Sequence, residues 1–202
     1  MSAITALTIQ ALAHVQSLPE GGLLSPKDLL HLGSRAAVDQ TLSRLAKGGQ
    51  LLRVARGFYV ASVHSRFGSR PPAPEKVVAA LAARGGEVAV PHGANAAHGL
   101  GLTQQVPIRE VFCSAGRDRT LTLGRSQVQI KHVPRWMLAL GTGPAGAAVR
   151  ALAWMGPNHA TPSLTKLRRS LSPADWHALT TGRAALPSWM AKAIGEAAAH
   201  SG

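Results

Sequence analysis

The chain has 202 residues, of which 46% are hydrophobic and 15% are charged, a composition that favours a folded protein over a disordered one. Lysine and arginine number 22 against 9 acidic residues, and the resulting net charge of +13 favours a phosphate-rich partner such as nucleic acid. No stretch approaches 18 consecutive apolar residues and the N-terminus does not read as a secretion signal, so we expect a soluble, cytoplasmic protein without a membrane span.

The positive charge is distributed along the whole chain. Net charge is +5 over residues 1–70, +5 over 71–160 and +3 over 161–202, so a basic tail does not account for it. An arginine-rich composition can also serve solubility alone, and this alternative stays open. The single cysteine, Cys113, excludes an internal disulfide and a multi-thiolate zinc site, and its apolar neighbours favour a buried side chain.

The chain begins with two predicted helices. Residues 4–15 carry apolar side chains at helical spacing, and Pro19 with the glycines that follow it ends this helix. A shorter second helix follows, because Ser25 suits its N-cap and Pro26 suits its first position. Gly33 ends this second helix after about two turns.

A longer helix is predicted over residues 35–47. Ser34 suits its N-cap, and the glycines at 48 and 49 suit a left-handed C-terminus. A short helix, a glycine-containing turn and a longer basic helix form the helix-turn-helix pattern. Val38, Leu42 and Leu45 recur at core spacing, and the opposite side carries a mixed set of small, polar and charged residues: Arg35, Ala36, Asp39, Gln40, Ser43, Arg44 and Lys47.

This opposite side suits a helix that reads the major groove of double-stranded DNA. Arginine can bind guanine with two hydrogen bonds, and glutamine can do the same with adenine. Residues near the start of such a helix usually reach base edges, whereas later ones contact phosphate. We therefore predict a DNA-binding surface that starts at Ser34, with base edges contacted by Arg35, Ala36, Asp39 and Gln40, and the backbone approached by Ser43, Arg44 and Lys47.

Residues 50–60 predict two short strands joined by a tight turn at Arg56 and Gly57. Directly after a recognition helix, such a hairpin is the wing of a winged helix-turn-helix. Arg53 and Arg56 are expected to contact the sugar-phosphate chain or a minor groove. The predicted DNA-binding domain spans residues 1–62, and a winged helix that binds protein instead of DNA is the alternative.

Two further segments complete the predicted organisation, whose fold class is α+β. Residues 63–74 are polar and proline-rich, which predicts a linker. Residues 75–202 predict a mixed α/β domain with a helical C-terminus. Its elements are a helix over 75–83, a strand over 87–90, a helix over 94–100, a strand over 109–114, a hairpin over 119–132 with alternating apolar residues, helices over 136–140 and 144–154, and further helices over 161–200.

Catalysis is not indicated. The few acidic residues of the second domain lack the clustered partners of a metal-dependent nuclease, and no lysine follows Glu87 two residues on. His92 and His98 are six residues apart and do not share a helix side, which argues against a zinc pair. The glycine-rich stretch 141–146 follows no clear strand and is interpreted as a turn between helices. We predict no catalytic residue, cofactor or metal, and a nuclease is the least favoured alternative.

Specific residues resemble the AbiEi family of antitoxins. In the N-terminal domain the resemblance lies in residues 25–30, 35–45 and 53–60. Residues 75–156 are similar to the companion domain of that family through several short motifs, which occupy residues 93–97, 100–103, 121–124, 132–135 and 151–154. The resemblance assigns no functional residue to this second domain.

The AbiEi resemblance implies the antitoxin component of a bacterial toxin–antitoxin or abortive-infection system. Such a winged helix represses the promoter of its own operon, commonly at inverted repeats. In the type IV arrangement, the antitoxin opposes a nucleotidyltransferase-like toxin without forming a stable complex with it. The resemblance therefore implies promoter DNA as the partner, and neutralisation of a toxin by direct binding is the alternative.

Overall fold

The computed structural model describes residues 3–66 and 68–199. The chain is mixed α+β, as predicted, and divides into two compact units. The first unit comprises Met1–Val88 and Asp118–Ile130, and the second comprises Ala89–Arg117 and Lys131–Gly202. Packing therefore groups the helix after residue 73 and most of the last hairpin with the N-terminal elements, whereas the sequence predicts that they belong to the second domain.

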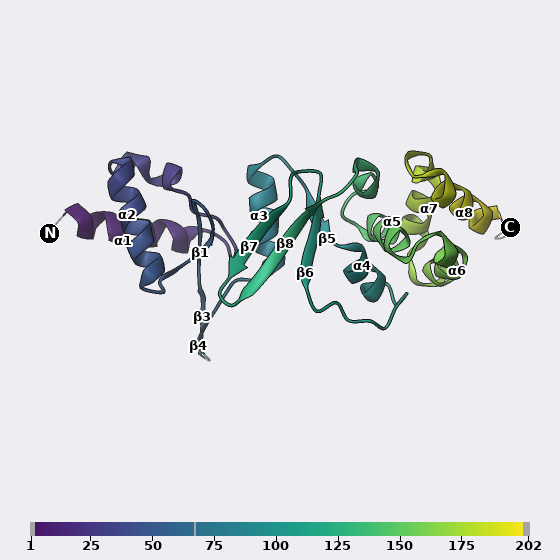
Figure 1. Cartoon of the computed structure of the whole chain (residues 1–202), viewed down its shortest axis with the longest axis horizontal. Coiled ribbons are helices and arrows are strands. Elements are labelled where there is room, and N and C mark those ends of the chain that lie inside the picture. Colours follow the sequence, from purple (N-terminus) through teal and green to yellow (C-terminus); the bar gives the residue numbers. More distant parts are fainter. Residues whose placement is uncertain (1–2, 67, 200–202) are drawn as a thin grey trace. The chain divides into compact units, whose positions relative to one another are not determined.

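The first unit contains the predicted helices and hairpin of the N-terminal region (Figure 1). Its elements are α1 (Ala3–Ser17), the 3₁₀ helix η1 (Pro26–Leu32), α2 (Arg35–Lys47), β1 (Leu51–Ala55), β2 (Phe58–Ala61), β3 (Val63–Ser65), β4 (Gly68–Arg70), α3 (Pro74–Arg84), β7 (Arg119–Leu123) and β8 (Ser126–His132), the last two residues of which belong to the second unit. The strands pair antiparallel as β1 with β2, β3 with β4, and β7 with β8.

Three elements of the first unit differ from the sequence-based expectation. The second helix is a 3₁₀ helix, and Ser25 starts it with its backbone N–H donating to Asp28 Oδ2 at 2.8 Å. The segment predicted to be a linker carries β3 and β4. Both strands are largely exposed on both sides, so they have no buried side that an alternating apolar pattern could have revealed.

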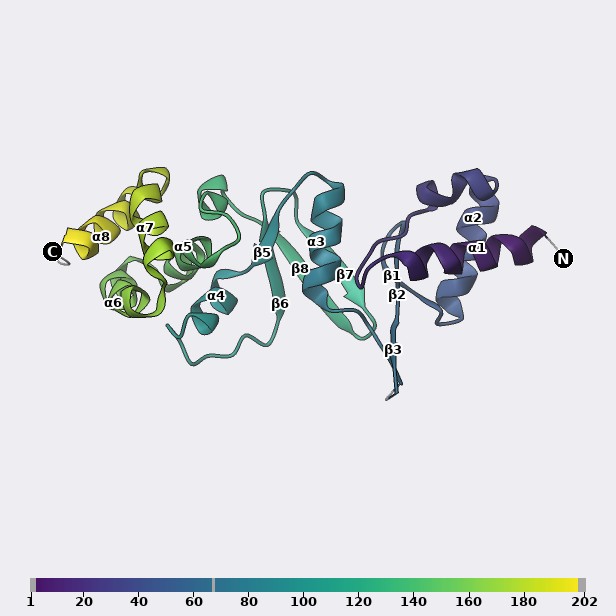
Figure 2. The ribbon, with the colours of Figure 1, turned by 180° about the vertical axis from the view of Figure 1, so that it is seen from behind.

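The apolar side of α2 forms the centre of the first hydrophobic core. Val38, Leu42 and Leu45 are buried there with apolar side chains of α1, of η1 and the segment before it, and of the hairpin, which are Leu7, Ala11, Val15, Leu24, Leu29, Leu51 and Tyr59. Helices α1 and α2 cross and contact each other (Figures 1 and 2). Leu24 and Tyr59 also exchange two backbone hydrogen bonds of 2.8 and 2.9 Å, which join the segment before η1 to β2.

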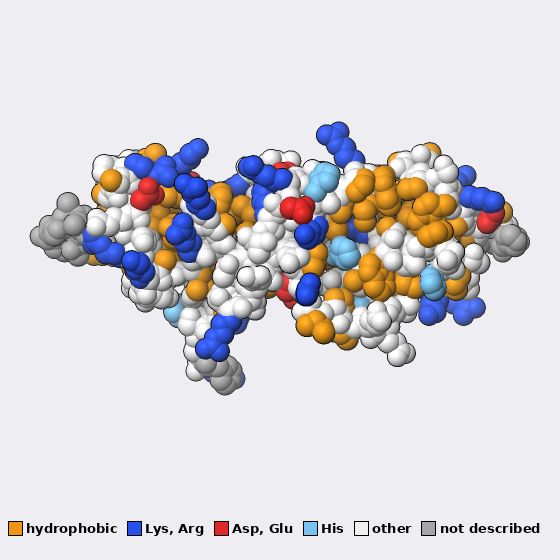
Figure 3. Space-filling view, in the orientation of Figure 1, with side chains coloured by type: hydrophobic (Ala, Val, Ile, Leu, Met, Phe, Trp, Pro, Cys, Tyr) orange, Lys and Arg blue, Asp and Glu red, His pale blue; other side chains and the backbone are white. Residues whose placement is uncertain are grey.

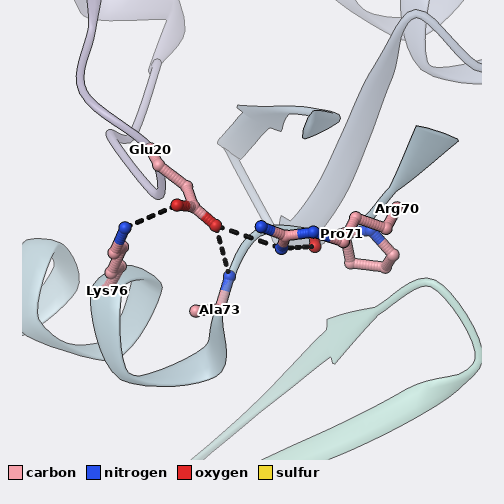
Figure 4. A network of polar contacts seen from close by, with 5 residues as sticks. All are labelled: Glu20, Arg70, Pro71, Ala73 and Lys76. Carbon is pink, nitrogen blue, oxygen red and sulfur yellow. Dashed lines mark hydrogen bonds and ion pairs between the residues drawn. The ribbon is translucent and has the colours of Figure 1, made fainter. Parts of the chain in front are cut away.

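A cluster around Glu20 ties the turn after α1 to the start of α3 (Figure 4). Glu20 Oε2 accepts from Lys76 Nζ at 2.5 Å, and Oε1 accepts from Arg70 Nη1 and from the Ala73 backbone N–H, both at 3.1 Å. The next residue, Gly21, has φ +81°, and a Cβ there would overlap Lys76, so only glycine allows this close approach.

The opposite end of α3 is held to η1 by a second ion pair. Arg84 Nη2 lies 2.6 Å from Asp28 Oδ2 and donates to the Leu23 carbonyl oxygen at 2.7 Å, and its guanidinium stacks over Phe58. Partial burial would raise the pKa of Asp28, but the hydrogen bonds from Arg84 and Ser25 outweigh it and hold that pKa below its usual range. Both ends of α3 are therefore anchored to the N-terminal helices.

The second unit places helices around α5. Its elements are β5 (Ala89–Pro91), α4 (Gly93–Gly99), β6 (Glu110–Ser114), η2 (Arg135–Leu138), α5 (Pro144–Met155), η3 (Pro157–His159), α6 (Ala160–Ser170), α7 (Pro173–Thr181), η4 (Gly182–Ala185) and α8 (Ser188–Ala199). Strand β5 pairs antiparallel with β6. The core draws Leu152 from α5, Leu164 from α6, Leu179 from α7 and Ile194 from α8. The predicted helical C-terminus is confirmed, although His200 lies outside the described residues.

Glu20→Gln is expected to lower the melting temperature at neutral pH, because an amide cannot accept charge-assisted hydrogen bonds. The pKa of Glu20 is lowered from 4.5 to about 2, chiefly by the Lys76 ammonium and then by the Ala73 N–H. The stabilisation is therefore complete above pH 4.5 and is lost as the pH falls towards about 2. Thermal denaturation of both proteins between pH 7 and 2 measures this.

The matched control is Glu75→Gln, which removes an exposed carboxylate one residue before Lys76 on the same helix. This variant should melt close to the wild type at every pH. A melting difference between wild type and Glu20→Gln that stayed constant down to pH 2 would contradict the assigned role of the carboxylate.

Candidate nucleic-acid interface

The structure brings the predicted site residues of the third helix together on one side of α2. Val38, Thr41, Leu42 and Leu45 are buried on the other side. The solvent side is exposed except for one half-buried serine, and we call it the α2 face: Arg35, Ala36, Asp39, Gln40, Ser43, Arg44 and Lys47. These positions recur every three to four residues, so the packing of the apolar side leaves all seven on one surface.

The two ends of α2 are set by local hydrogen bonds. Ser34 is exposed and its Oγ accepts from the Ala37 backbone N–H at 3.3 Å, so the predicted cap is confirmed. At the other end, Gly48 has φ −78° and Gly49 has φ +75°. The left-handed residue that ends the helix is thus the second glycine of the predicted pair.

An ion pair lies within the α2 face. Arg35 Nε donates to Asp39 Oδ2 at 2.8 Å, with the two side chains 56% and 48% exposed. Exposed pairs of this type contribute little to stability, because water screens them and two long side chains must be ordered. Arg35, which the sequence predicts to contact a base edge, is therefore paired with Asp39 in this structure, but weakly.

The β1–β2 hairpin carries the other two predicted residues. Arg53 is exposed on β1, and Arg56 is exposed at the turn, where Gly57 adopts φ +76°. The strand register shifts between Arg53 and Ala55, which marks a bulge in β1. Because Leu51 of β1 belongs to the same core as the apolar side of α2, helix and hairpin are parts of one packed unit. Figure 3 shows lysine and arginine side chains over the surface around α2.

The β3–β4 hairpin adds basic residues in a segment that the sequence predicts to be a linker. Arg66 and His64 are exposed on it. Arg70, at the end of β4, donates instead to Glu20 and to the Pro71 carbonyl oxygen, so it serves the fold. A basic cluster flanking Gly68 was the available sequence signal for a second turn, but without a buried side it did not distinguish a hairpin from a linker.

The two histidines whose spacing argues against a zinc pair, His92 and His98, lie in the second unit. His92 is half-buried, and its Nδ1 accepts from the Ala94 backbone N–H at 3.3 Å. Within residues 3–66 and 68–199, no group of three or more histidine, cysteine, aspartate or glutamate side chains could hold a metal ion. None of the helices described combines the length and the apolar character needed to cross a membrane.

Comparison with known proteins identifies a family. Residues 10–170 match DUF6088, a family of unknown function. The chain belongs to the DUF6088 family. The matched part of this DUF6088 chain includes η1, the α2 face and the β1–β2 hairpin, and it extends through α6. No curated protein and no solved structure matches the chain.

Asp39→Asn in this DUF6088 protein should change the free energy of unfolding by less than about 0.5 kcal/mol, because the pair with Arg35 is exposed. Asp28→Asn is the matched comparison, since its carboxylate is more sheltered and binds both Arg84 and the Ser25 N–H. That variant should cost about 1–3 kcal/mol. Chemical denaturation measures both free energies of unfolding. Equal decreases in the two variants would show that the Arg35–Asp39 pair stabilises the fold as much as the Asp28 contacts do.

Proposed function

We propose that this chain is a DNA-binding transcriptional regulator in which α2 enters the major groove of a duplex. The observation that carries the proposal is the two-sided character of α2. Its apolar side is held in the core by α1, η1 and the hairpin, while three cations, a glutamine and a serine remain on the α2 face. The order of helix, 3₁₀ helix, helix and hairpin supports a winged helix-turn-helix.

Each part of the surface has its own task in this proposal. Arg35 and Gln40 hydrogen-bond base edges, and Arg35 exchanges its weak pair with Asp39 for a guanine. Further along the helix, Arg44 and Lys47 bind phosphate. The exposed arginines of the β1–β2 hairpin bind the sugar-phosphate chain on the flank.

The resemblance to AbiEi antitoxins supports a more specific role. The residues that carry it, 25–30, 35–45 and 53–60, fall on η1, α2 and the β1–β2 hairpin. In this role the protein acts in the cytoplasm and represses the promoter of its own operon at inverted repeats. It also opposes a nucleotidyltransferase-like toxin without a stable complex between the two proteins.

Direct binding of a protein partner is the second candidate, and the loop before β6 favours it. Ile108 is 99% exposed and Val106 is 68% exposed, and both line a pocket of about 440 Å³ next to Trp154. Exposed apolar side chains gathered in this way are typical of interaction surfaces. A toxin bound there would be neutralised by contact with the second unit.

The decisive experiment measures binding of the purified protein to a duplex from upstream of its own gene and to a shuffled duplex, at 50 and 200 mM salt. Affinity should fall steeply with salt, because phosphate contacts release counterions. Gln40→Ala should weaken binding to the promoter duplex by about 1–3 kcal/mol and to the shuffled duplex much less. Arg56→Ala should weaken both equally and lower the salt slope by about one.

Lys192→Ala is the matched control, since it removes one exposed charge from α8 in the second unit and should leave both affinities unchanged. Failure to bind any duplex at 50 mM salt would overturn the proposal. A stable complex with a toxin, combined with no binding to the promoter, would favour the second candidate.

A further inference from the structure

The second unit contains an aromatic pocket built around a buried arginine. The pocket measures about 500 Å³, a size typical of small-molecule sites, and three tryptophans line it: Trp136, Trp154 and Trp189. The titratable side chains among its lining residues are those of His92 and Arg150, and each tryptophan adds an indole N–H donor. The remaining lining residues are glycine, alanine, methionine and proline, so the pocket wall is mainly apolar.

Arg150 lacks a counterion within the part of the chain that the structure describes. The residue is 1% exposed, its Nη1 donates to the Gly141 carbonyl oxygen at 3.2 Å, and its Nε has no hydrogen-bond partner. Buried Cys113 is its electrostatic neighbour, but burial raises the pKa of that thiol and so favours the neutral form. The Arg150 guanidinium stays protonated although burial lowers its pKa, since arginine remains charged in proteins.

Two glycines allow the close backbone packing around Arg150. A Cβ on Gly146 would overlap the Gly141 carbonyl oxygen, so the turn 141–143 can fold against α5 only with glycine there. A Cβ on Gly93 would overlap the Arg150 backbone, so α4 can approach α5 only through that glycine. The fold thus keeps a buried charge at the pocket wall, although burying a charge without a counterion lowers the stability of a protein.

We propose that this pocket binds a small organic monoanion with a flat apolar body, such as an aromatic carboxylate. The carboxylate pairs with the guanidinium of Arg150, whose Nε has no hydrogen-bond partner within the described part of the chain, while the ring packs among the tryptophans. One fixed cation matches one negative charge. Burial lowers the pKa of His92 and so favours its neutral form, which makes a phosphate dianion the poorer fit.

This proposal goes beyond DNA binding and does not rest on it. The experiment uses the full chain without DNA and follows intrinsic tryptophan fluorescence and melting temperature. The probes are benzoate, its neutral counterpart benzyl alcohol, and inorganic phosphate, each added up to about 10 mM. Three of the four tryptophans line the pocket, so occupancy should change the emission. Benzoate should change the emission and raise the melting temperature, while benzyl alcohol and phosphate should have much smaller effects.

Variants separate a ligand-binding role of the arginine from a structural one. Arg150→Met keeps an unbranched apolar stem and removes the charge, so it should fold at least as stably and bind benzoate at least about tenfold more weakly. Arg150→Lys retains the charge and should keep part of the affinity. Arg169→Met, which removes an exposed charge from α6, and Trp176→Phe, which removes the tryptophan outside the pocket, should both bind benzoate as the wild type does.

Three results would overturn the proposal. The first is wild-type protein that does not respond to benzoate, and the second is equal responses to benzoate and benzyl alcohol. The third is unchanged benzoate binding by Arg150→Met. If Arg150→Met does not fold, the proposal is tested by comparing benzoate with benzyl alcohol on the wild type and on Arg150→Lys. Because no DNA is present, these outcomes are independent of those for the duplex.

Discussion

The burial of one side of α2 is the constraint on which the first unit depends. Val38, Leu42 and Leu45 are the part of this helix around which α1, η1 and the β1–β2 hairpin share one core. Burying these side chains removes apolar surface from water, and the same act fixes which side of the helix remains in solvent. The α2 face is therefore a consequence of packing. The core beneath it holds the proposed DNA interface in place.

Helix α3 extends this rigidity beyond the N-terminal elements. Its first turn binds Glu20 through Lys76, and its last turn binds Asp28 through Arg84. Both carboxylates have lowered pKa values because each accepts several hydrogen bonds, Glu20 from the start of α3 and its flank and Asp28 from Arg84 and the Ser25 backbone N–H. Three acidic residues occur in the first 70 residues, and two of them, Glu20 and Asp28, form the ion pairs that hold α3 to the N-terminal elements. The third, Asp39, is the acidic member of the α2 face.

The hairpin arginines of the first unit and Arg150 of the second unit lie in opposite surroundings. In the first unit, Arg53 and Arg56 stay in solvent, where a charge costs little and can meet phosphate. In the second unit, Arg150 is buried in an alanine-rich helix without a carboxylate partner among the residues described, where a charge is expensive. Exposed arginines suit a polyanion that binds along a surface, and a single buried one suits a small anion in a pocket.

Local signals in the sequence determined most of the secondary structure of this protein and the membership of the α2 face. Ser34, the glycines after Lys47 and the spacing of the apolar residues are short-range patterns, and the helix over 35–47 follows from them directly. Tertiary structure decided what those patterns could not express: the grouping of α3 with the N-terminal helices, the exposed β3–β4 hairpin, and the burial of Arg150. These features depend on contacts between residues distant in sequence or on strands with no buried side. Neither cause produces a periodic pattern of apolar residues in the sequence.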